Sequence, residues 1–176
     1  MIPKYTRLQR VQRDIPADFI DAGVWKSNLR QLARQRMDDH GWTCDCIRCR
    51  EVGMNDADPE TVELDVLTYE AAGGTEHFIS YEDPENDLLI GFCRLREPGN
   101  PVRRELEDAA LVRELHVYGP MVEVGDESYD WQHKGYGRKL LRKAEEMAAD
   151  AGYDKLSVIS GIGAREYYRE KLGYHQ

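Results

Sequence analysis

The 176-residue sequence has no long apolar run and only four cysteines. No stretch of about 18 apolar residues occurs, and the first residues contain no apolar signal region. We therefore expect a cytoplasmic protein with no membrane partner. Internal repeats and low-complexity tracts are also missing. With 41% hydrophobic residues, a chain of this length can bury one substantial core and at most a small appended unit.

Positive charge is scarce, and it is distributed unevenly. The formal net charge is −9, but residues 1–50 contain 10 Lys and Arg against 6 Asp and Glu, whereas residues 51–176 contain 14 against 27. An acidic chain is a poor general binder of nucleic acid, and most such basic residues are simply solvated. The basic N-terminal part could nevertheless contact phosphates. The candidate RNA-binding residues are Arg7, Arg10, Arg13, Arg30, Arg34, Arg48 and Arg50.

The pattern of apolar residues divides the chain near residue 57. Residues 1–57 predict a helix that is capped by Ser27 or Asn28, runs to about Asp39 and is stopped by Gly41. Residues 58–176 predict an α/β (α+β) fold with a mixed antiparallel and parallel sheet. Its expected strands are residues 62–71, 75–81, 88–96, 110–118 and 155–160, with a hairpin turn at residues 72–74.

A glycine-rich turn, residues 132–137, joins the strand at residues 110–118 to an amphipathic helix. Without side chains at Gly135 and Gly137, the backbone can approach a ligand closely, and the first N–H groups of the helix favour an anion such as pyrophosphate. Many turns of this kind only join a strand to a helix. A dinucleotide-binding turn fits poorly, because Leu140 stands where that motif needs its third glycine.

Three of the cysteines, Cys44, Cys46 and Cys49, lie within six residues as C-x-C-x2-C. In a cytosolic chain such crowding indicates a shared metal rather than disulfides, and tetrahedral Zn²⁺ suits three thiolates. Free thiols or iron are the alternatives. His40 is the nearest candidate for a fourth ligand, His77 is more remote, and a donor from outside the chain is a third possibility.

Segments along the whole chain resemble one family, the catalytic subunits of the Elongator complex, which modify the wobble uridine of tRNA. Their acetyltransferase part has the GNAT fold, in which a Q-x-x-G-x-G turn holds acetyl-CoA. The matching segments are residues 6–16, 46–53, 78–84, 89–91, 94–96, 112–119, 132–137, 158–161 and 167–169.

The resemblance implies a domain arrangement. In that family a radical S-adenosylmethionine domain with a [4Fe-4S] cluster precedes the acetyltransferase domain, and together they use acetyl-CoA to build a carboxymethyl group on carbon 5 of the uridine. No cysteine lies before Cys44, so we expect most of that domain to be absent from this sequence. Residues 1–57 would be its remnant with a zinc-binding linker, and residues 58–176 the GNAT domain. The implied partners are the tRNA anticodon region and other Elongator-type subunits or a second copy.

The resemblance also implies site residues. The turn would hold the pyrophosphate, and the strand would pair with the pantetheine, the N–H of Val117 polarising the thioester carbonyl. Tyr167 or Tyr168 would protonate the departing thiolate. Glu114 and His116 share one strand face and are candidate bases, although His116 could be a core histidine. The implied CoA-contacting residues are Leu115, His116, Val117, Gln132, His133, Lys134, Gly135, Tyr136, Gly137, Arg138 and Tyr168.

These features predict a domain that cleaves the thioester of acetyl-CoA when tRNA is present and passes acetate to the radical domain. A protein lysine acetyltransferase is the alternative within the enzyme class. The third interpretation is a zinc-stapled module that binds RNA or a protein partner without turnover.

Overall fold

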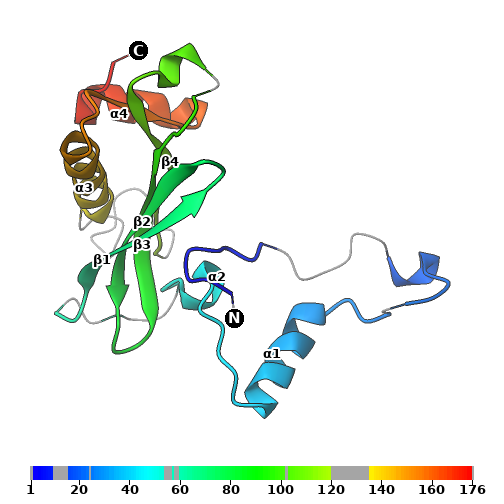
Figure 1. Cartoon of the computed structure of the whole chain (residues 1–176). Coiled ribbons are helices and arrows are strands. Elements are labelled where there is room, and N and C mark those ends of the chain that lie inside the picture. Colours follow the sequence, from blue (N-terminus) through cyan, green and yellow to red (C-terminus); the bar gives the residue numbers. More distant parts are fainter. Residues whose placement is uncertain are drawn as a thin grey trace. The chain divides into compact units, whose positions relative to one another are not determined.

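The computed structural model describes residues 2–9, 16–23, 25–53, 57, 60–101, 103–119 and 135–175. The chain forms two compact units, Met1–Arg50 and Glu51–Gln176. The sequence pattern placed the boundary between its two parts near residue 57. Figure 1 shows their elements. Some expected site residues lie outside the described part of the chain, namely Arg10, Arg13, Gln132, His133 and Lys134.

The first unit contains little secondary structure. Its elements are η1 (Ala17–Phe19), α1 (Leu29–Asp39) and α2 (Ile47–Arg50). The α1 helix ends as expected, with Gly41 in the left-handed region at φ +67°. Asn28 is the N-cap residue, as expected, but its side chain makes no hydrogen bond to the helix backbone, and its Nδ2 donates to Gln31 Oε1 (3.1 Å). No residue of α1 is buried, so packing alone gives this helix little stability.

The second unit is built on a five-stranded mixed sheet in the order β1-β2-β3-β4-β5, as the sequence predicted. The first three pairings are antiparallel, and β4 and β5 are parallel. The β1–β2 hairpin closes through Ala72 and Gly73, both at positive φ, which matches the right-handed twist of the strands. The strands are β1 (Glu63–Ala71), β2 (Gly74–Asp83), β3 (Leu88–Glu97), β4 (Ala109–Val117) and β5 (Lys155–Val158).

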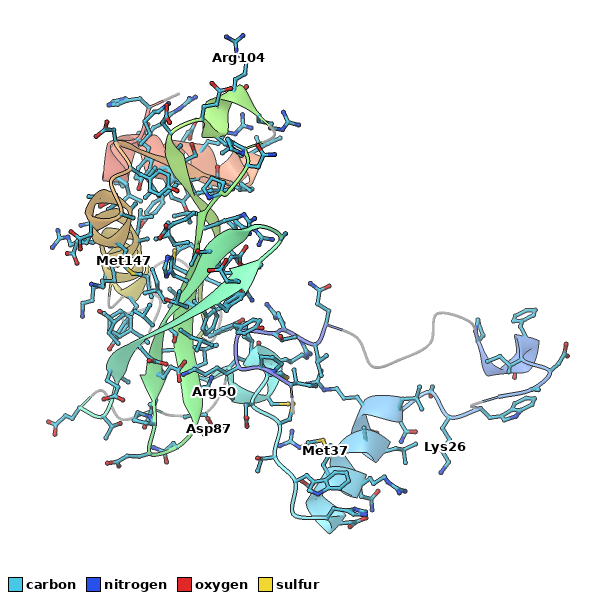
Figure 2. The ribbon with its side chains drawn as sticks, in the orientation of Figure 1. Lys26, Met37, Arg50, Asp87, Arg104 and Met147 are labelled. Atoms are coloured by element: carbon cyan, nitrogen blue, oxygen red, sulfur yellow. The ribbon has the colours of Figure 1, made fainter. Side chains whose placement is uncertain are left out.

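Two helices pack on one face of this sheet. The long α3 (Tyr136–Asp150) joins β4 to β5, and α4 (Arg165–Leu172) follows β5; two short 3-10 turns are η2 (Arg104–Leu106) and η3 (Ile162–Ala164). Apolar residues recur along α3 at helical spacing, so they all meet the sheet. Figure 2 shows Met147 on α3, and it packs against the same core. The buried core residues are Ile79, Cys93, Leu95, Ala110, Val112, Leu140, Leu141, Ala144 and Ala148.

The core also contains the cysteine that lies outside the C-x-C-x2-C motif. Cys93 is fully buried, as expected for a small strand residue, and burial raises the pKa of its thiol to about 12. The thiol of Cys93 therefore stays protonated at neutral pH.

None of the described helices is long and apolar enough to cross a membrane.

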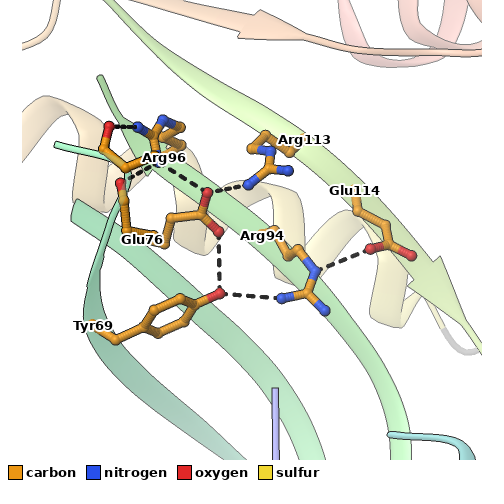
Figure 3. A network of polar contacts seen from close by, with 8 residues as sticks. Tyr69, Glu76, Arg94, Arg96, Arg113 and Glu114 are labelled. Carbon is orange, nitrogen blue, oxygen red and sulfur yellow. Dashed lines mark hydrogen bonds and ion pairs between the residues drawn. The ribbon is translucent and has the colours of Figure 1, made fainter. Parts of the chain in front are cut away.

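A polar network lies on the opposite face of the sheet (Figure 3), centred on Glu76 of β2, whose side chain is only 3% exposed. Tyr69 of β1 donates its hydroxyl to this carboxylate (3.1 Å), Arg96 of β3 donates from 3.2 Å, and Arg113 of β4 also donates to it. Burial by itself raises the pKa of Glu76, but the hydrogen bond and charge of Arg113, with help from Tyr69 and Arg96, outweigh burial and lower it. The carboxylate is therefore ionised at neutral pH.

Replacing Glu76 by glutamine keeps the shape of the side chain but removes its charge. We expect the free energy of unfolding at pH 7 to fall by about 1–2 kcal/mol, because charge-assisted hydrogen bonds from two guanidinium groups are lost. Since the folded-state pKa of Glu76 is lowered, its contribution is present above the unfolded value of about 4.3 and disappears as the pH falls through the folded value. Urea unfolding at several pH values measures both effects.

The matched control is Glu146→Gln, which removes an exposed carboxylate that pairs with Lys143 at 3.6 Å. An exposed pair of this kind contributes little, so its stability should change by less than about 0.5 kcal/mol. Equal stability of Glu76→Gln and the wild type at pH 7 would contradict a stabilising role for this carboxylate.

Candidate functional site

The strands β4 and β5 pair over only part of β4. Their register runs from Ala109 opposite Lys155 to Val112 opposite Val158, and the N–H of Ile159 donates to the carbonyl of Val112 (2.9 Å). Beyond Val112, β4 continues to Val117 beside β3, and no described residue pairs with it on the β5 side. Part of an edge of β4 is therefore available for a ligand.

A β-bulge decides which peptide groups face that open edge. The register opposite β3 shifts between Arg94 and Leu95, where β4 contributes one extra residue. After the shift, the N–H of Tyr118 donates to the carbonyl of Ile90 on β3 (2.8 Å). Because peptide groups alternate along a strand, those of Leu115 and Val117 point away from β3. The strand expected to pair with pantetheine also included His116 and Tyr118, whose peptide groups point toward β3 instead.

The glycines at the start of α3 lie beside the end of β4. Gly135 is the N-cap residue at φ +75°, a conformation that favours glycine, and a Cβ there would meet no atom within 4 Å. A Cβ on Gly137 would lie 3.6 Å from the Cγ2 of Val117, which is an ordinary contact. Neither glycine is thus required by close packing of the protein itself. Space remains at both for an approaching ligand.

The side chain of Tyr136, which lies between the two glycines in the sequence, packs in the core. Its ring is buried and meets the ring of Tyr81 edge to face, with centroids 4.8 Å apart. Burial, and then the neighbouring Tyr81, raises its pKa. Only its backbone could serve a ligand, whereas Arg138 in the next turn is exposed.

The two candidate proton donors have different surroundings. Tyr168 is half-buried against the core and lines a cavity of about 640 Å³ that also includes Leu156 and Ser160. Burial, with smaller effects of Cys93 and Tyr167, raises the pKa of Tyr168, so its hydroxyl stays protonated at neutral pH. Tyr167 is 47% exposed and does not line that cavity. The structure therefore distinguishes two tyrosines that the sequence left equivalent.

Glu114 and His116 lie on the sheet face opposite α3, across from Arg94 and Phe92 of β3. The Nε of Arg94 donates to the carboxylate of Glu114 (3.0 Å), as Figure 3 shows, so Glu114 is an ion-pair partner. His116 is exposed, which does not fit a core histidine, and its ring lies 4.5 Å from that of Tyr118. A base on this face is separated from Tyr168 by the thickness of the sheet.

The three cysteines of the first unit come together. The Sγ atoms of Cys44, Cys46 and Cys49 lie within 4.8 Å of one another, and no other group of this kind occurs among the described residues. Their loop is fixed by hydrogen bonds from the N–H of Ile47 to the carbonyl of Thr6 (3.0 Å) and from the N–H of Cys49 to that of Cys46 (2.9 Å). This spacing fits three ligands of one metal ion.

The ionisation of the cluster also fits a cation. Burial opposes the ionisation of Cys46, but hydrogen bonds from Cys44 and Cys49 outweigh it and lower the pKa of Cys46. The pKa of Cys49 is raised to about 12, by desolvation first and then by its two neighbours. One thiolate thus resists the formation of the next, and a divalent cation would remove this repulsion.

Neither histidine considered as the fourth ligand belongs to the group formed by the three cysteines. His40 follows α1, where its Nδ1 donates to the carbonyl of Arg36 (2.7 Å). His77 belongs to the second unit and is hydrogen-bonded to Thr68 Oγ1 (2.9 Å) and Glu97 Oε1 (2.7 Å). The described residues therefore provide three ligands.

The candidate RNA-binding arginines do not form one set. Arg34 and Arg48 are exposed, and Arg7 is half-buried. Arg50 is only 4% exposed, so it does not fit the predicted role of a surface contact to RNA. Arg30 places Nη2 3.9 Å from the Sγ of Cys49, a position beside the cluster that the sequence pattern gave no reason to expect.

Comparison with known proteins explains the arrangement of β4, the glycine-rich helix start and α4. The profile of the Acetyltransferase (GNAT) family matches residues 44–174. The chain belongs to this family.

Individual relatives place the chain in a narrower group within this family. The chain is 52% identical over 100% of its length to the tRNA uridine(34) acetyltransferase of Methanocaldococcus jannaschii and covers 34% of that protein. It is 48% identical over 99% of its length to Elongator complex protein 3 of Schizosaccharomyces pombe, of which it also covers 34%. The resemblance found in the sequence is thus confirmed.

A solved structure agrees. The archaeal Methanocaldococcus infernus Elp3 with an N-terminus deletion (1-46) matches with a TM-score of 0.91 and 48% identity, covering 100% of this chain and 43% of that one. The chain spans about a third of the length of the curated relatives that it matches.

Proposed function

We propose that this chain is the acetyl-CoA-binding and thioester-cleaving part of a tRNA uridine(34) modification enzyme that acts in the cytoplasm. The open edge of β4 carries this proposal, because it leaves the peptide groups of Leu115 and Val117 without a strand partner among the described residues. The names of the relatives support tRNA as the substrate. Membership in an Elongator-type assembly is supported in the same way.

The pantetheine arm would extend β4 as a further strand would, by hydrogen bonds to Leu115 and Val117. The pyrophosphate would lie at the helix start, where Gly135 and Gly137 leave room and the first N–H groups of α3 have no helical partner. The Gly137 Cβ position lies 3.6 Å from Val117, so one continuous ligand can reach both places.

The chemistry would be hydrolysis of a thioester. The N–H of Val117 would donate to the thioester carbonyl and stabilise the negative charge that develops there. Water would add to the carbonyl carbon, the C–S bond would break, and Tyr168 would give its proton to the departing thiolate. The water would release a proton to a base, and Tyr168 would regain a proton from solvent. The products, acetate, CoA and one proton, balance acetyl-CoA plus water.

His116 and Glu114 are the candidates for accepting the proton of the water. His116 is exposed and Glu114 is held by Arg94. Both lie on the sheet face opposite Tyr168, so either would accept this proton through intervening water at the open edge of β4. In the complete enzyme the acetate would pass to a radical S-adenosylmethionine domain with a [4Fe-4S] cluster, which would build the carboxymethyl group on carbon 5 of the uridine. The cysteine cluster would hold Zn²⁺ with a structural role.

Gly137→Val tests the acetyl-CoA site. The larger side chain should weaken acetyl-CoA binding by at least about tenfold, because it fills the approach to the helix start. A single Cβ makes only an ordinary contact with Val117, so the fold should persist. Isothermal titration calorimetry with acetyl-CoA gives the affinity, and thermal unfolding reports the fold.

Ala149→Val, at an exposed position near the end of the same helix, is the matched control and should bind acetyl-CoA normally. If Gly137→Val bound acetyl-CoA as tightly as the wild type, the ligand would lie elsewhere.

A further inference from the structure

The first two turns of α3 carry four cations on the side of the helix that faces away from the core. They are Arg138, Lys139, Arg142 and Lys143, and no acidic residue occurs between positions 135 and 144. These are four of the 14 Lys and Arg in residues 51–176, which contain 27 Asp and Glu. A cluster of four cations within an otherwise acidic unit favours the binding of an anionic ligand.

The cations border a hollow of about 390 Å³ that also has an aromatic component. Tyr81 of β2 and Leu64 of β1 contribute its apolar surface. The ring of Tyr81 is fixed by the ring of Tyr136, 4.8 Å away, and the Nζ of Lys139 lies 4.8 Å above the Tyr136 ring. Glu146 and Gly135 complete the lining.

Most of this charge is available to a ligand. Lys143 forms an exposed pair with Glu146 (3.6 Å), which contributes little. Within the described ranges, no carboxylate lies at ion-pair distance from Arg138 or Arg142, and both are exposed. They stand four positions apart on one helix face, so their Cβ atoms are about 5–6 Å from each other.

This hollow adjoins the candidate acetyl-CoA site, with which it shares Gly135 and Arg138, and extends from there away from the open edge of β4. Its strand residues come from β1 and β2, whereas the acetyl-CoA groups lie at the junction of β4 and β5. With strands about 4.8 Å apart, β2 and β5 are separated by about 14 Å, and α3 packs over the strands between them.

We propose that this surface, formed by Arg138, Lys139, Arg142 and Lys143 around Tyr81, binds the phosphate backbone of tRNA. Several cations along one ridge fit a polyanion, and an aromatic ring beside them offers a stacking platform for an unpaired base. The inference rests on the proposed function for the choice of tRNA. It places an RNA contact on the unit that holds acetyl-CoA, in addition to any contact through the N-terminal arginines.

The variant Arg142→Glu/Lys143→Glu tests this surface and leaves every residue assigned to acetyl-CoA unchanged. Fluorescence anisotropy with an unmodified tRNA, at salt concentrations from about 50 to 300 mM, gives the affinity and its salt dependence. We expect at least about tenfold weaker binding near physiological salt. The slope of log K against log[salt] should become shallower by about 1.5, because two phosphate contacts are lost at about 0.7–0.9 each. Acetyl-CoA affinity should be unchanged.

The control Arg103→Glu/Lys171→Glu makes the same change of net charge at exposed positions outside the hollow, and it should bind tRNA more tightly than the test variant. If charge reversal unfolded the helix, Arg142→Gln/Lys143→Gln would remove the same contacts without adding repulsion. This glutamine variant should also bind tRNA more weakly than the wild type, but by a smaller factor than the charge-reversal variant.

Four outcomes would overturn the inference. Unchanged tRNA binding by both test variants would leave this surface without an RNA role while the proposed function stands. Equal losses in the test and control variants would mean that only the overall charge matters. Weaker binding of acetyl-CoA but not of 3′-dephospho-CoA would assign the cations to the cosubstrate. A wild type that binds acetyl-CoA but no tRNA would overturn the inference and the tRNA part of the proposed function, but not its acetyl-CoA part.

Discussion

Replacing Cys44, Cys46 and Cys49 together by serine should abolish binding of about one zinc ion and unfold the segment around α1 and α2. Packing gives this segment little stability of its own, since α1 buries no residue and the four-residue α2 buries only Ile47 and Arg50. Structural zinc sites in small domains contribute about 10–16 kcal/mol of apparent binding free energy at neutral pH, which here would be folding free energy. Elemental analysis measures the metal, and hydrogen exchange over residues 28–50 measures the order.

Cys93→Ala is the matched control for this experiment. It removes the remaining thiol from the core of the sheet, so it should lower the stability of the second unit and keep the zinc. The triple serine variant should lose the zinc but keep the stability of the second unit, which should retain its own unfolding transition. A wild-type protein that is fully folded without metal, or that holds a stoichiometric metal other than zinc, would overturn the assignment.

Tyr168→Phe should slow thioester cleavage by about 10²-fold or more, since general acid catalysis contributes about that much. Tyr167→Phe should retain nearly full activity, because this side chain is 47% exposed and does not line the cavity that contains Tyr168. CoA release in the presence of tRNA measures the rate. Acetyl-CoA affinity should be nearly the same in both variants, which separates a loss of chemistry from a loss of binding.

The pH dependence provides a second measurement of the same role. The donor must be protonated, and burial raises the pKa of Tyr168 above its ordinary value of about 10. The rate should therefore decline with this group only above about pH 10. A loss of activity in Tyr167→Phe equal to that in Tyr168→Phe, or no loss in either, would contradict the assignment of Tyr168.

Local patterns in the sequence predicted most of the elements, because they depend on neighbouring residues. Alternation of apolar residues located the strands, and helical spacing located α3, so the mixed sheet was predicted correctly. The C-x-C-x2-C spacing likewise predicted that three thiols would meet. In each case the signal lies within about ten residues.

Features that depend on distant parts of the chain were not predicted. The bulge opposite Arg94 and the short pairing of β4 with β5 arise from how strands align, and no local pattern encodes them. Adjacent tyrosines on a helix have the same local signal, and only packing distinguishes Tyr168. Arg50 was taken for a surface cation, but it is buried. Residue type and charge therefore indicated candidate proton donors and RNA contacts, but the burial of each side chain was needed to choose among them.

The network around Glu76 has a consequence for how the sheet assembles. Its partners come from β1, β3 and β4, so one carboxylate on β2 joins four successive strands. A slip of β2 by one residue would turn Glu76 toward the apolar side of the sheet, where Ile79 and Cys93 lie, and would leave two guanidinium groups without this acceptor. Misaligned sheets are thus penalised. Glu76 favours the native alignment of these four strands over alignments shifted by one residue.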